Sequence, residues 1–218
     1  MPRAQLDTGI ELEYETMGAP SDPTLLVVCG FTSQMTTGWD PGLCEAFVAQ
    51  GLHVVRFDNR DVGLSTKCEG RINPMAIIRA RQAGEPVPEV PYTLSDMAAD
   101  GIGLLDHLGI ERAHVAGMSM GGMIVQTMAI EHPDRVASLI SVMSPTGDHR
   151  VGQATPAARD ALLAAPALDR QSYVDASVRS AVWASKKYCD LDAMRDRAGR
   201  DFDRSVLAAA VGGHVRTA

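Results

Sequence analysis

The chain has 218 residues, of which 45% are hydrophobic and 22% are charged, and its formal net charge is −7. A chain of this size and composition is typical of a globular protein with one sizeable core. The negative charge argues against a surface for nucleic acid or for an anionic membrane, because both need basic patches. No apolar run reaches transmembrane length. Scattered cysteines without CxxC spacing predict no metal site and favour a reducing cytoplasm.

The first half of the chain alternates between predicted strands and helices. Alternating character predicts a strand at 9–16, and a short apolar run predicts a buried strand at 24–30. Residues 52–58 are likewise expected to form a buried strand. A helical pattern over 39–50 ends at Gly51. Residues 64–92 contain several prolines and are expected to form a long loop or short irregular helices.

The same alternation continues to residue 144. Thr93 and Asp96 predict a capping box that opens a helix ending at Gly109. A strand at 113–119, a helix at 120–131 and a strand at 135–144 follow.

This order of elements defines the expected fold class. Alternating strands and helices predict an α/β protein whose sheet is mainly parallel and covered by helices on both faces. From Pro145 onward, alanine-rich helical patterns run to the end without another convincing buried strand. We therefore expect a core over 1–144 and a helical cap segment over 145–218.

A serine flanked by glycines marks the most informative position. Gly117-Met118-Ser119-Met120-Gly121 lies between a predicted strand and a predicted helix, where the G-x-S-x-G pattern forms a nucleophile elbow. Side chains two residues from the serine would clash in so sharp a turn, which explains both glycines. Ser119 would then stand at a helix N-terminus, where the Met120 N–H favours a developing oxyanion.

Two further segments follow predicted strands at the same edge of the sheet. Gly30 permits a tight turn, after which the Phe31 N–H would join that of Met120 as a second oxyanion donor. The segment 57–66 carries Asp58, Arg60 and Asp61. We expect an Asp–Arg pair to tie this loop and to buttress the site without taking part in the chemistry.

These segments together resemble a known family. "LLVVCGFTSQ", "GLHVVRFDNRDVGLST", "AADGIGLLDHLGIERAHVAGMSMGGMI" and "EHPDRVASLISVMS" resemble the α/β-hydrolase superfamily, and within it the aclacinomycin methylesterase type. The resemblance implies hydrolysis of a small-molecule ester through an acyl-enzyme on Ser119, with no cofactor. The superfamily loop commonly has glycine where this chain has Asp61, although the methylesterase branch also has aspartate there.

The catalytic acid and base are harder to assign. Members of that family continue beyond the cap into a strand that carries the acid and a loop that carries the histidine, so the resemblance implies that this chain stops before both. On this interpretation His214 is not the base. Asp148 and His149, which follow the strand at 135–144, are weak candidates because adjacent side chains point apart.

Several functions fit this sequence. A serine esterase, weak or inactive without its acid and base, is the leading hypothesis. A non-catalytic binding protein on a hydrolase scaffold, and a cofactor-free peroxidase or peptidase of the same superfamily, remain alternatives. A nucleotide-binding protein is disfavoured, because no phosphate-binding glycine motif follows a strand. If the later strands are missing, the strand at 135–144 becomes an exposed edge, through which copies of the chain could associate.

Overall fold

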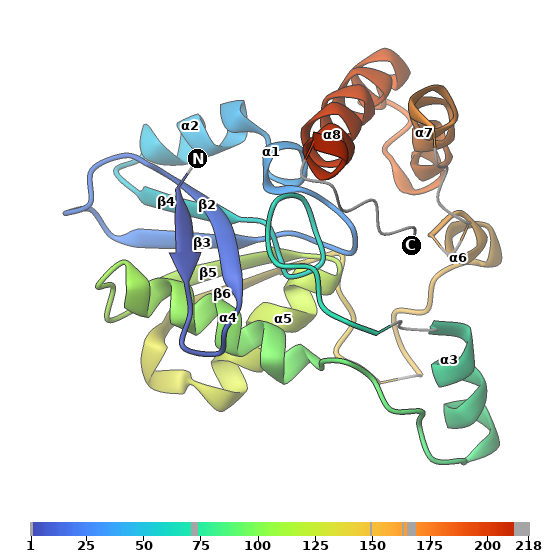
Figure 1. Ribbon diagram of the computed structural model, residues 1–218, viewed down its shortest axis with the longest axis horizontal. Helices are drawn as coiled ribbons and strands as arrows, with labels where there is room; N and C mark the ends of the chain where they lie inside the picture. Colours follow the sequence, from blue (N-terminus) through green and yellow to red (C-terminus); the bar gives the residue numbers. More distant parts are fainter. Residues whose placement is uncertain (1, 71–73, 149, 163, 165–168, 212–218) are drawn as a thin grey trace.

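A six-stranded sheet in the order β1-β2-β4-β3-β5-β6 forms the centre of the molecule (Figure 1). The computed structural model describes residues 2–70, 74–148, 150–162, 164 and 169–211. Its strands are β1 (Arg3–Gln5), β2 (Glu11–Met17), β3 (Thr24–Val28), β4 (His53–Phe57), β5 (Ala113–Met118) and β6 (Val136–Val142). The strands β4, β3, β5 and β6 pair in parallel, and β2 is antiparallel to β1 and β4. The predicted mainly parallel sheet is confirmed.

Helices cover both faces of this sheet, as predicted (Figure 1). They are α1 (Met35–Gly38), α2 (Pro41–Val48), α4 (Leu94–His107) and α5 (Met120–Glu131). Every residue of β3 is buried, and its side chains alternate between the two faces. Leu26 and Val28 pack with residues of α4 and α5, whereas Leu25 and Val27 pack with Met35 and other residues around α1 and α2. The side chains of this apolar strand therefore contribute to two hydrophobic cores, one on each face of the sheet.

The predicted start of α4 is confirmed in detail. The Thr93 side chain accepts a hydrogen bond from the Asp96 N–H (3.3 Å), and the Asp96 carboxylate accepts one from the Thr93 N–H (2.7 Å). This reciprocal arrangement is a capping box with aspartate in place of the usual glutamate.

Two further elements complete the core. Helix α3 (Pro74–Ala83) occupies part of the segment 64–92, for which short helices were one of the two expected alternatives. The strand β1, which adds three residues to the edge of the sheet, was not predicted. Pro74 is the first residue of α3, where its missing N–H costs no hydrogen bond, so a proline that was interpreted as a loop signal begins a helix.

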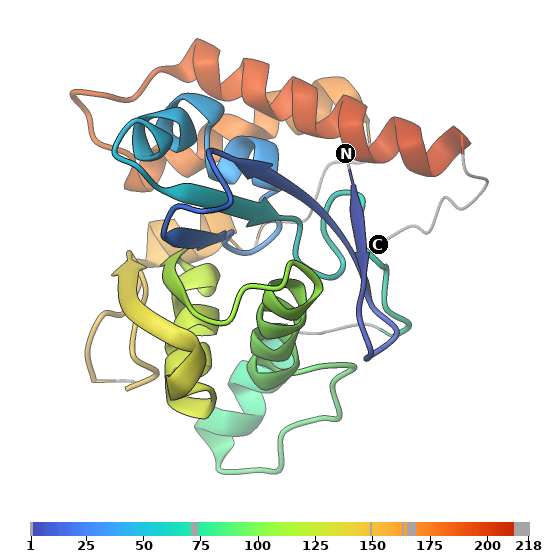
Figure 2. The ribbon, with the colours of Figure 1, turned by 90° about the vertical axis from the view of Figure 1, so that its left-hand side faces the viewer.

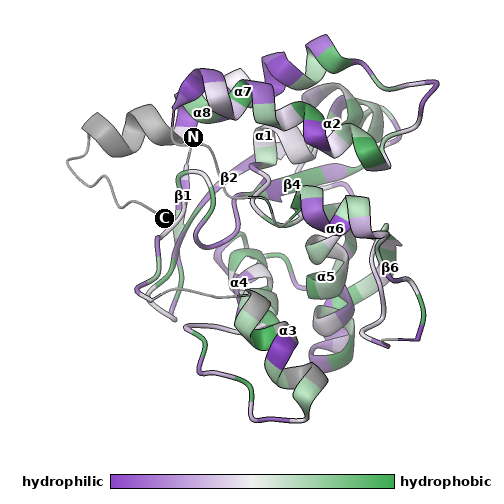
Figure 3. Cartoon of the chain, turned by 90° about the vertical axis from the view of Figure 1, so that its right-hand side faces the viewer, coloured by the Kyte–Doolittle hydropathy of each residue, from purple (hydrophilic) through white to green (hydrophobic). Residues whose placement is uncertain are grey.

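Beyond residue 144 the described residues form helices and no strand. They are α6 (Pro156–Leu162), α7 (Arg170–Ser177), the 3₁₀ helix η2 (Val178–Trp183) and α8 (Leu191–Val211); a further 3₁₀ turn, η1 (Pro133–Arg135), precedes β6. Figure 2 shows α8 as a long helix across one side of the molecule, and Figure 3 shows hydrophilic residues in α7 and in the coloured part of α8. Within the described part of the chain, every helix is too short or too polar to cross a bilayer.

Strand β6 lies at the edge of the sheet. In the sheet of the described residues it pairs with β5 alone. Leu139 is 41% exposed and Ile140 is 51% exposed. An apolar strand with an unpaired edge is a site at which another strand can add.

Candidate active site

Backbone strain is concentrated at the carboxyl edge of the four parallel strands. Among the described residues, the non-glycine residues with positive φ are Thr32, Asp61, Ser119 and Met143. They follow β3, β4, β5 and β6 respectively. Positive φ is uncommon outside glycine, and such strain is found preferentially at functional sites. The carboxyl ends of these strands are therefore the candidate functional site.

Ser119 occupies a sharp turn between β5 and α5. Its φ of 56° and ψ of −122° lie outside both helix and strand geometry. Its N–H donates to the Val142 carbonyl of β6 (2.9 Å), and its own carbonyl accepts from the Gly122 N–H (2.9 Å), which begins the first turn of α5. The serine is half-buried. Strand, turn and helix thus have the arrangement that the motif predicts.

The glycines on either side of Ser119 have no room for a side chain. A Cβ atom on Gly117 would lie 2.1 Å from the Gly121 carbonyl oxygen, and one on Gly121 would lie 2.2 Å from the Val28 carbonyl oxygen. The same holds for Gly122, which was not singled out in the sequence, because its Cβ would lie 2.4 Å from Ser144 Cβ. The turn is compact because β5, α5 and the neighbouring strands meet here without intervening side chains.

The segment after β3 lies directly against Ser119. A Cβ atom on Gly30 would lie 3.2 Å from Ser119 Cβ and 3.7 Å from its Oγ. The Ser33 N–H donates to the Gly30 carbonyl (3.3 Å), and Thr32 has a φ of 59°, which together describe a turn of type II character. We call residues 30–35 the oxyanion loop, after the role that the sequence predicts for Phe31.

The two N–H groups named from the sequence, those of Phe31 and Met120, are not engaged by the described residues. In the part of the chain that the structure describes, no hydrogen bond is donated by the Phe31 N–H or the Met120 N–H. Met120 is the first residue of α5, so its N–H has no acceptor within the helix. Both groups are thus available to an external oxygen.

The loop after β4 is held by charged side chains, but with other partners than expected. Arg60 does not pair with an aspartate of its own loop: it donates two bonds of 2.7 Å to Asp100 of α4, and both side chains are buried. Asp58, which is fully buried, instead accepts from Arg204 of α8 (2.7 Å). Asp61, with a φ of 67°, takes the left-handed conformation for which glycine is common, and its carboxylate accepts from the Cys68 N–H (2.7 Å).

Of the two weak candidates, the structure describes Asp148, whose carboxylate is engaged by Arg150. The Asp148 side chain is 32% exposed and accepts from the Arg150 side chain (2.7 Å) and its N–H (2.9 Å). The Arg150 guanidinium holds the pKa of Asp148 below its ordinary value. His149 and His214 lie outside the described residues.

The described histidines lie at the amino ends of the parallel strands, whereas Ser119 lies at their carboxyl ends. His53 and His114 lie at the starts of β4 and β5, while His107 and His132 lie at the ends of α4 and α5. His53 bonds to Thr24 (3.2 Å), and His114 bonds to Ser138 (2.8 Å). Because the helices return to the amino ends of the strands, these four side chains are placed away from Ser119.

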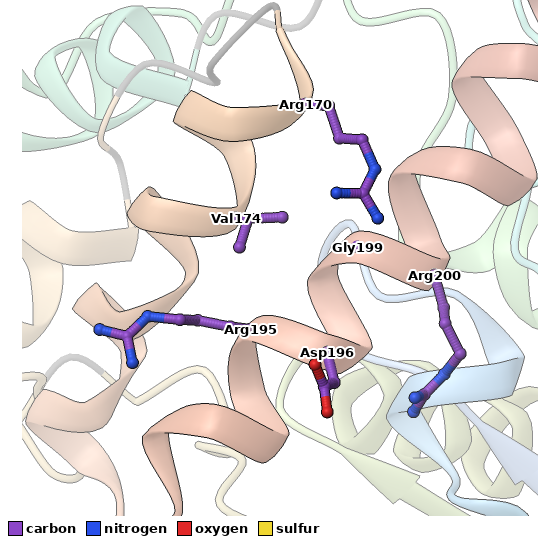
Figure 4. A pocket seen from close by; sticks show the side chains of 6 residues that line it. All are labelled: Arg170, Val174, Arg195, Asp196, Gly199 and Arg200. Carbon is purple, nitrogen blue, oxygen red and sulfur yellow. The ribbon is translucent and has the colours of Figure 1, made fainter.

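Two cavities were found away from the serine. One of about 300 Å³ lies between α7 and α8 (Figure 4), and one of about 410 Å³ is lined by residues near the amino end of β5. The linings of both exclude Ser119, Phe31 and Met120. In the described ranges no group of three or more potential metal ligands is brought together.

Asp201 of α8 is a partly buried acid close to this edge. Its Oδ2 accepts from the Thr37 hydroxyl (2.7 Å), whereas the buried Oδ1 atom has no hydrogen-bond partner among the described residues. Burial raises the pKa of Asp201 from 3.8 to about 6, although Thr37 and Arg204 oppose the rise. The folded chain therefore holds this proton more tightly than the unfolded chain does, and ionisation of Asp201 costs stability.

Replacing Asp201 with asparagine should make the protein more stable at neutral pH. Between pH 4 and 6 the folded state binds more protons at residue 201 than the unfolded state, so the free energy of unfolding falls as the pH rises. We expect Asp201→Asn to gain about 1–2 kcal/mol at pH 7, after allowance for solvent screening, and nothing below pH ~4. Urea unfolding of both proteins at several pH values measures the difference, and a difference independent of pH would contradict this assignment.

The fold and the serine turn define an α/β hydrolase. A family model described as alpha/beta hydrolase fold matches residues 23–181, and the chain belongs to this family. Rhodomycin D methylesterase DnrP of Streptomyces peucetius is 32% identical to it over 130 residues, which are 60% of this chain and 38% of the methylesterase. The homoserine O-acetyltransferase of Thermus thermophilus is 38% identical over 80 residues, which cover 36% of this chain and 20% of that protein.

A solved structure supports the same fold. The enol-lactonase from Burkholderia xenovorans LB400 superimposes with a TM-score of 0.61 at 24% identity, covering 92% of this chain and 68% of that one. At this identity the likeness shows the fold alone. The alignments with the curated relatives span less than half of the length of those proteins.

Proposed function

We propose that this chain carries the nucleophile and the oxyanion-binding groups of a serine ester hydrolase. The observation that supports this most strongly is the strained Ser119, half-buried between β5 and α5 with the oxyanion loop against it. Ser119 Oγ attacks the ester carbonyl carbon and forms a tetrahedral intermediate. The Phe31 and Met120 N–H groups donate to its oxyanion. Collapse expels the alcohol and leaves an acyl-enzyme, which water hydrolyses; these steps need no cofactor.

The similar proteins support a choice of substrate class. Similarity to a methylesterase supports a small methyl ester as the first substrate to test. Similarity to an O-acetyltransferase is compatible with the same acyl-enzyme, which would then pass its acyl group to an alcohol rather than to water. The two outcomes differ only in the acceptor.

A substrate panel tests this proposal. Matched methyl esters, p-nitrophenyl esters and p-nitroanilides separate esterase from peptidase activity, and product analysis with added alcohols separates hydrolysis from transfer. We expect ester cleavage that is lost in Ser119→Ala. Cleavage of neither ester would support a binding protein on a hydrolase scaffold, and peroxide-dependent halogenation would support the peroxidase alternative.

The base that activates Ser119 is left open in this proposal. The described histidines lie at the other edge of the sheet, and Asp148 is engaged by Arg150. A serine hydroxyl without a base is a poor nucleophile. We therefore propose that the 218-residue chain by itself is a slow esterase, with Asp148 and His149 as weak candidates for the missing roles.

We further propose that exposed β6 edges associate. Ile140 is half exposed on this strand, so Ile140→Lys should shift the chain toward monomer by placing a charge at the edge. Sedimentation velocity over a range of concentrations measures this shift. Ile130→Lys, on α5 and 79% exposed, is the control for charge alone. A wild-type chain that is monomeric at all concentrations would rule the association out.

A further inference from the structure

The long helix α8 is joined to the oxyanion loop by a buried amide. Gln34 is 4% exposed, and both ends of its side-chain amide bond to α8. Its Nε2 donates to the Asp201 carbonyl (2.8 Å) and to Ser205 Oγ (3.1 Å). Its Oε1 accepts from Arg204 Nη1 (2.6 Å). A loop side chain 170 positions away from Arg204 is thus fixed in orientation by one turn of α8.

Arg204 reaches the same loop by a second route. The Nη1 atom that bonds to Gln34 also donates to Asp58 Oδ2 (2.7 Å). The other carboxylate oxygen, Asp58 Oδ1, accepts from the Met35 N–H (2.8 Å). Asp58 is 0% exposed and the Arg204 side chain is 15% exposed, so this ion pair is largely removed from water. Charge-assisted bonds in such a setting are stronger and more directional than surface pairs.

The oxyanion loop is therefore held at both ends. Gly30 lies against Ser119 at one end, and Gln34 and Met35 are held by Arg204 and Asp58 at the other. The Phe31 N–H lies between these anchors. An N–H donor stabilises an oxyanion only when it is aimed at the position that the oxygen will occupy.

We propose that α8 positions the oxyanion donor of Phe31, with Arg204 and Gln34 as positioning residues for acyl transfer at Ser119. This inference rests on the proposed esterase function. Catalysis is sensitive to such placement, since a displacement of about 1 Å can cost roughly 10²-fold in rate. Helices of the cap segment would then contribute to turnover as well as to substrate choice.

The side of α8 that faces α7 provides a matched control. Arg170 of α7 donates to both carboxylate oxygens of Asp203 (2.8 and 2.9 Å). Figure 4 shows Arg170 above Gly199, on the side where α7 faces α8. These side chains are 54% and 42% exposed. Asp203→Asn therefore removes a charged contact from α8 without touching the buried bonds to the oxyanion loop.

The experiment compares Arg204→Met, Gln34→Leu and Asp203→Asn with the wild-type chain. The first readout is the rate at which a fluorophosphonate probe labels Ser119. In that reaction the Oγ–P bond forms, the P–F bond breaks, fluoride leaves and the hydroxyl proton passes to solvent. The second readout is the kcat and KM for p-nitrophenyl acetate. The third is hydrogen exchange of the amides of residues 31–35, which does not depend on activity.

We expect labelling and kcat to fall by about 10- to 100-fold in Arg204→Met and Gln34→Leu, with KM changed less than about twofold. Exchange over 31–35 should become about tenfold faster or more in both, because the Met35 bond and the Gln34 anchor are weakened. Arg204→Lys should recover part of the kcat, and Asp203→Asn should resemble the wild type. Gln34→Leu retains the Arg204–Asp58 pair, so it remains informative if Arg204→Met fails to fold.

A folded Gln34→Leu variant with wild-type labelling, kcat and exchange would overturn the proposal. Failure of the esterase function is distinguishable from this result. If Ser119 of the wild-type chain takes no label, the proposed function fails, and the exchange rates alone then decide whether α8 holds the oxyanion loop.

Discussion

Gly121→Ala should destabilise the protein severely. The added Cβ would lie 2.2 Å from the Val28 carbonyl oxygen and 2.6 Å from that of Cys29. Both atoms belong to the backbone at the end of β3, a central strand that is bonded on both sides, so neither can move as a flexible side chain would. Overpacking that displaces backbone is at the upper end of core substitutions, and we expect a loss of at least about 3 kcal/mol.

Urea unfolding followed by circular dichroism measures this loss. Gly42→Ala is the matched control, because its Cβ would approach only the Asp40 carboxylate oxygen, at 3.2 Å. That glycine lies in α2, where alanine is favoured over glycine by roughly 0.5–1 kcal/mol. Equal unfolding midpoints for Gly121→Ala and the wild type would mean that β3, β5 and α5 do not meet as described.

Ser119→Ala should remove the part of ester cleavage that passes through an acyl-enzyme. In a complete serine relay, loss of the serine or the histidine costs on the order of 10⁶ in kcat, while the oxyanion donors and binding leave about 10³–10⁴ over water. On the proposed function the chain supplies the serine and the donors without an identified base, so we expect slow cleavage of p-nitrophenyl acetate through an acyl-enzyme. The variant should form no acyl-enzyme, and its remaining cleavage should be only what the donors contribute to direct attack by water.

Steady-state kcat/KM values measure the effect. Ser95→Ala is the control, since Ser95 Oγ donates to Glu131 on an exposed helix surface and has no part in the proposed chemistry. Turnover of an ordinary ester at typical enzyme rates, lost in Ser119→Ala but not in Ser95→Ala, would show that a base within this chain had been missed.

Much of the core could be predicted because its signals are local. The strand β3 is a continuous apolar run and β4 is rich in valine, and the sheet buries every one of their residues. Thr93 and Asp96 are three residues apart, and the side chain of each accepts a hydrogen bond from the backbone N–H of the other. The start of α4 can therefore be predicted from the sequence. The serine turn is equally local, because the need for glycine at 117 and 121 arises from atoms within a few residues and from the adjacent strand.

The features that could not be predicted depend on contacts between distant parts of the chain. Arg204 and Asp58 are 146 residues apart, and no local pattern links them. Arg60 was expected to find its acid within its own loop, whereas its partner is Asp100, 40 residues away. A run of arginines and aspartates on α8 is typical of a solvated helix face. Only the fold shows that Arg204 and Asp201 are turned inward.

The weak candidacy of Asp148 and the failure to single out Gly122 also have physical explanations. Asp148 follows a strand at the correct edge, which made it a candidate, but Arg150 is two residues away and takes up its carboxylate. Gly122 carried no signal, because a second glycine in a row is explained equally well by chance. Its close approach to Ser144 becomes visible only when α5 packs beside the segment after β6.

The central claim is that Ser119 is a nucleophile, and the site of fluorophosphonate attachment tests it most directly. The purified chain is treated with the probe, digested and analysed by mass spectrometry, with Ser119→Ala treated in parallel. We predict one adduct on the peptide that contains Ser119, formed slowly, and no adduct in the variant. An adduct on another residue, or equal labelling of the wild type and Ser119→Ala, would contradict the account.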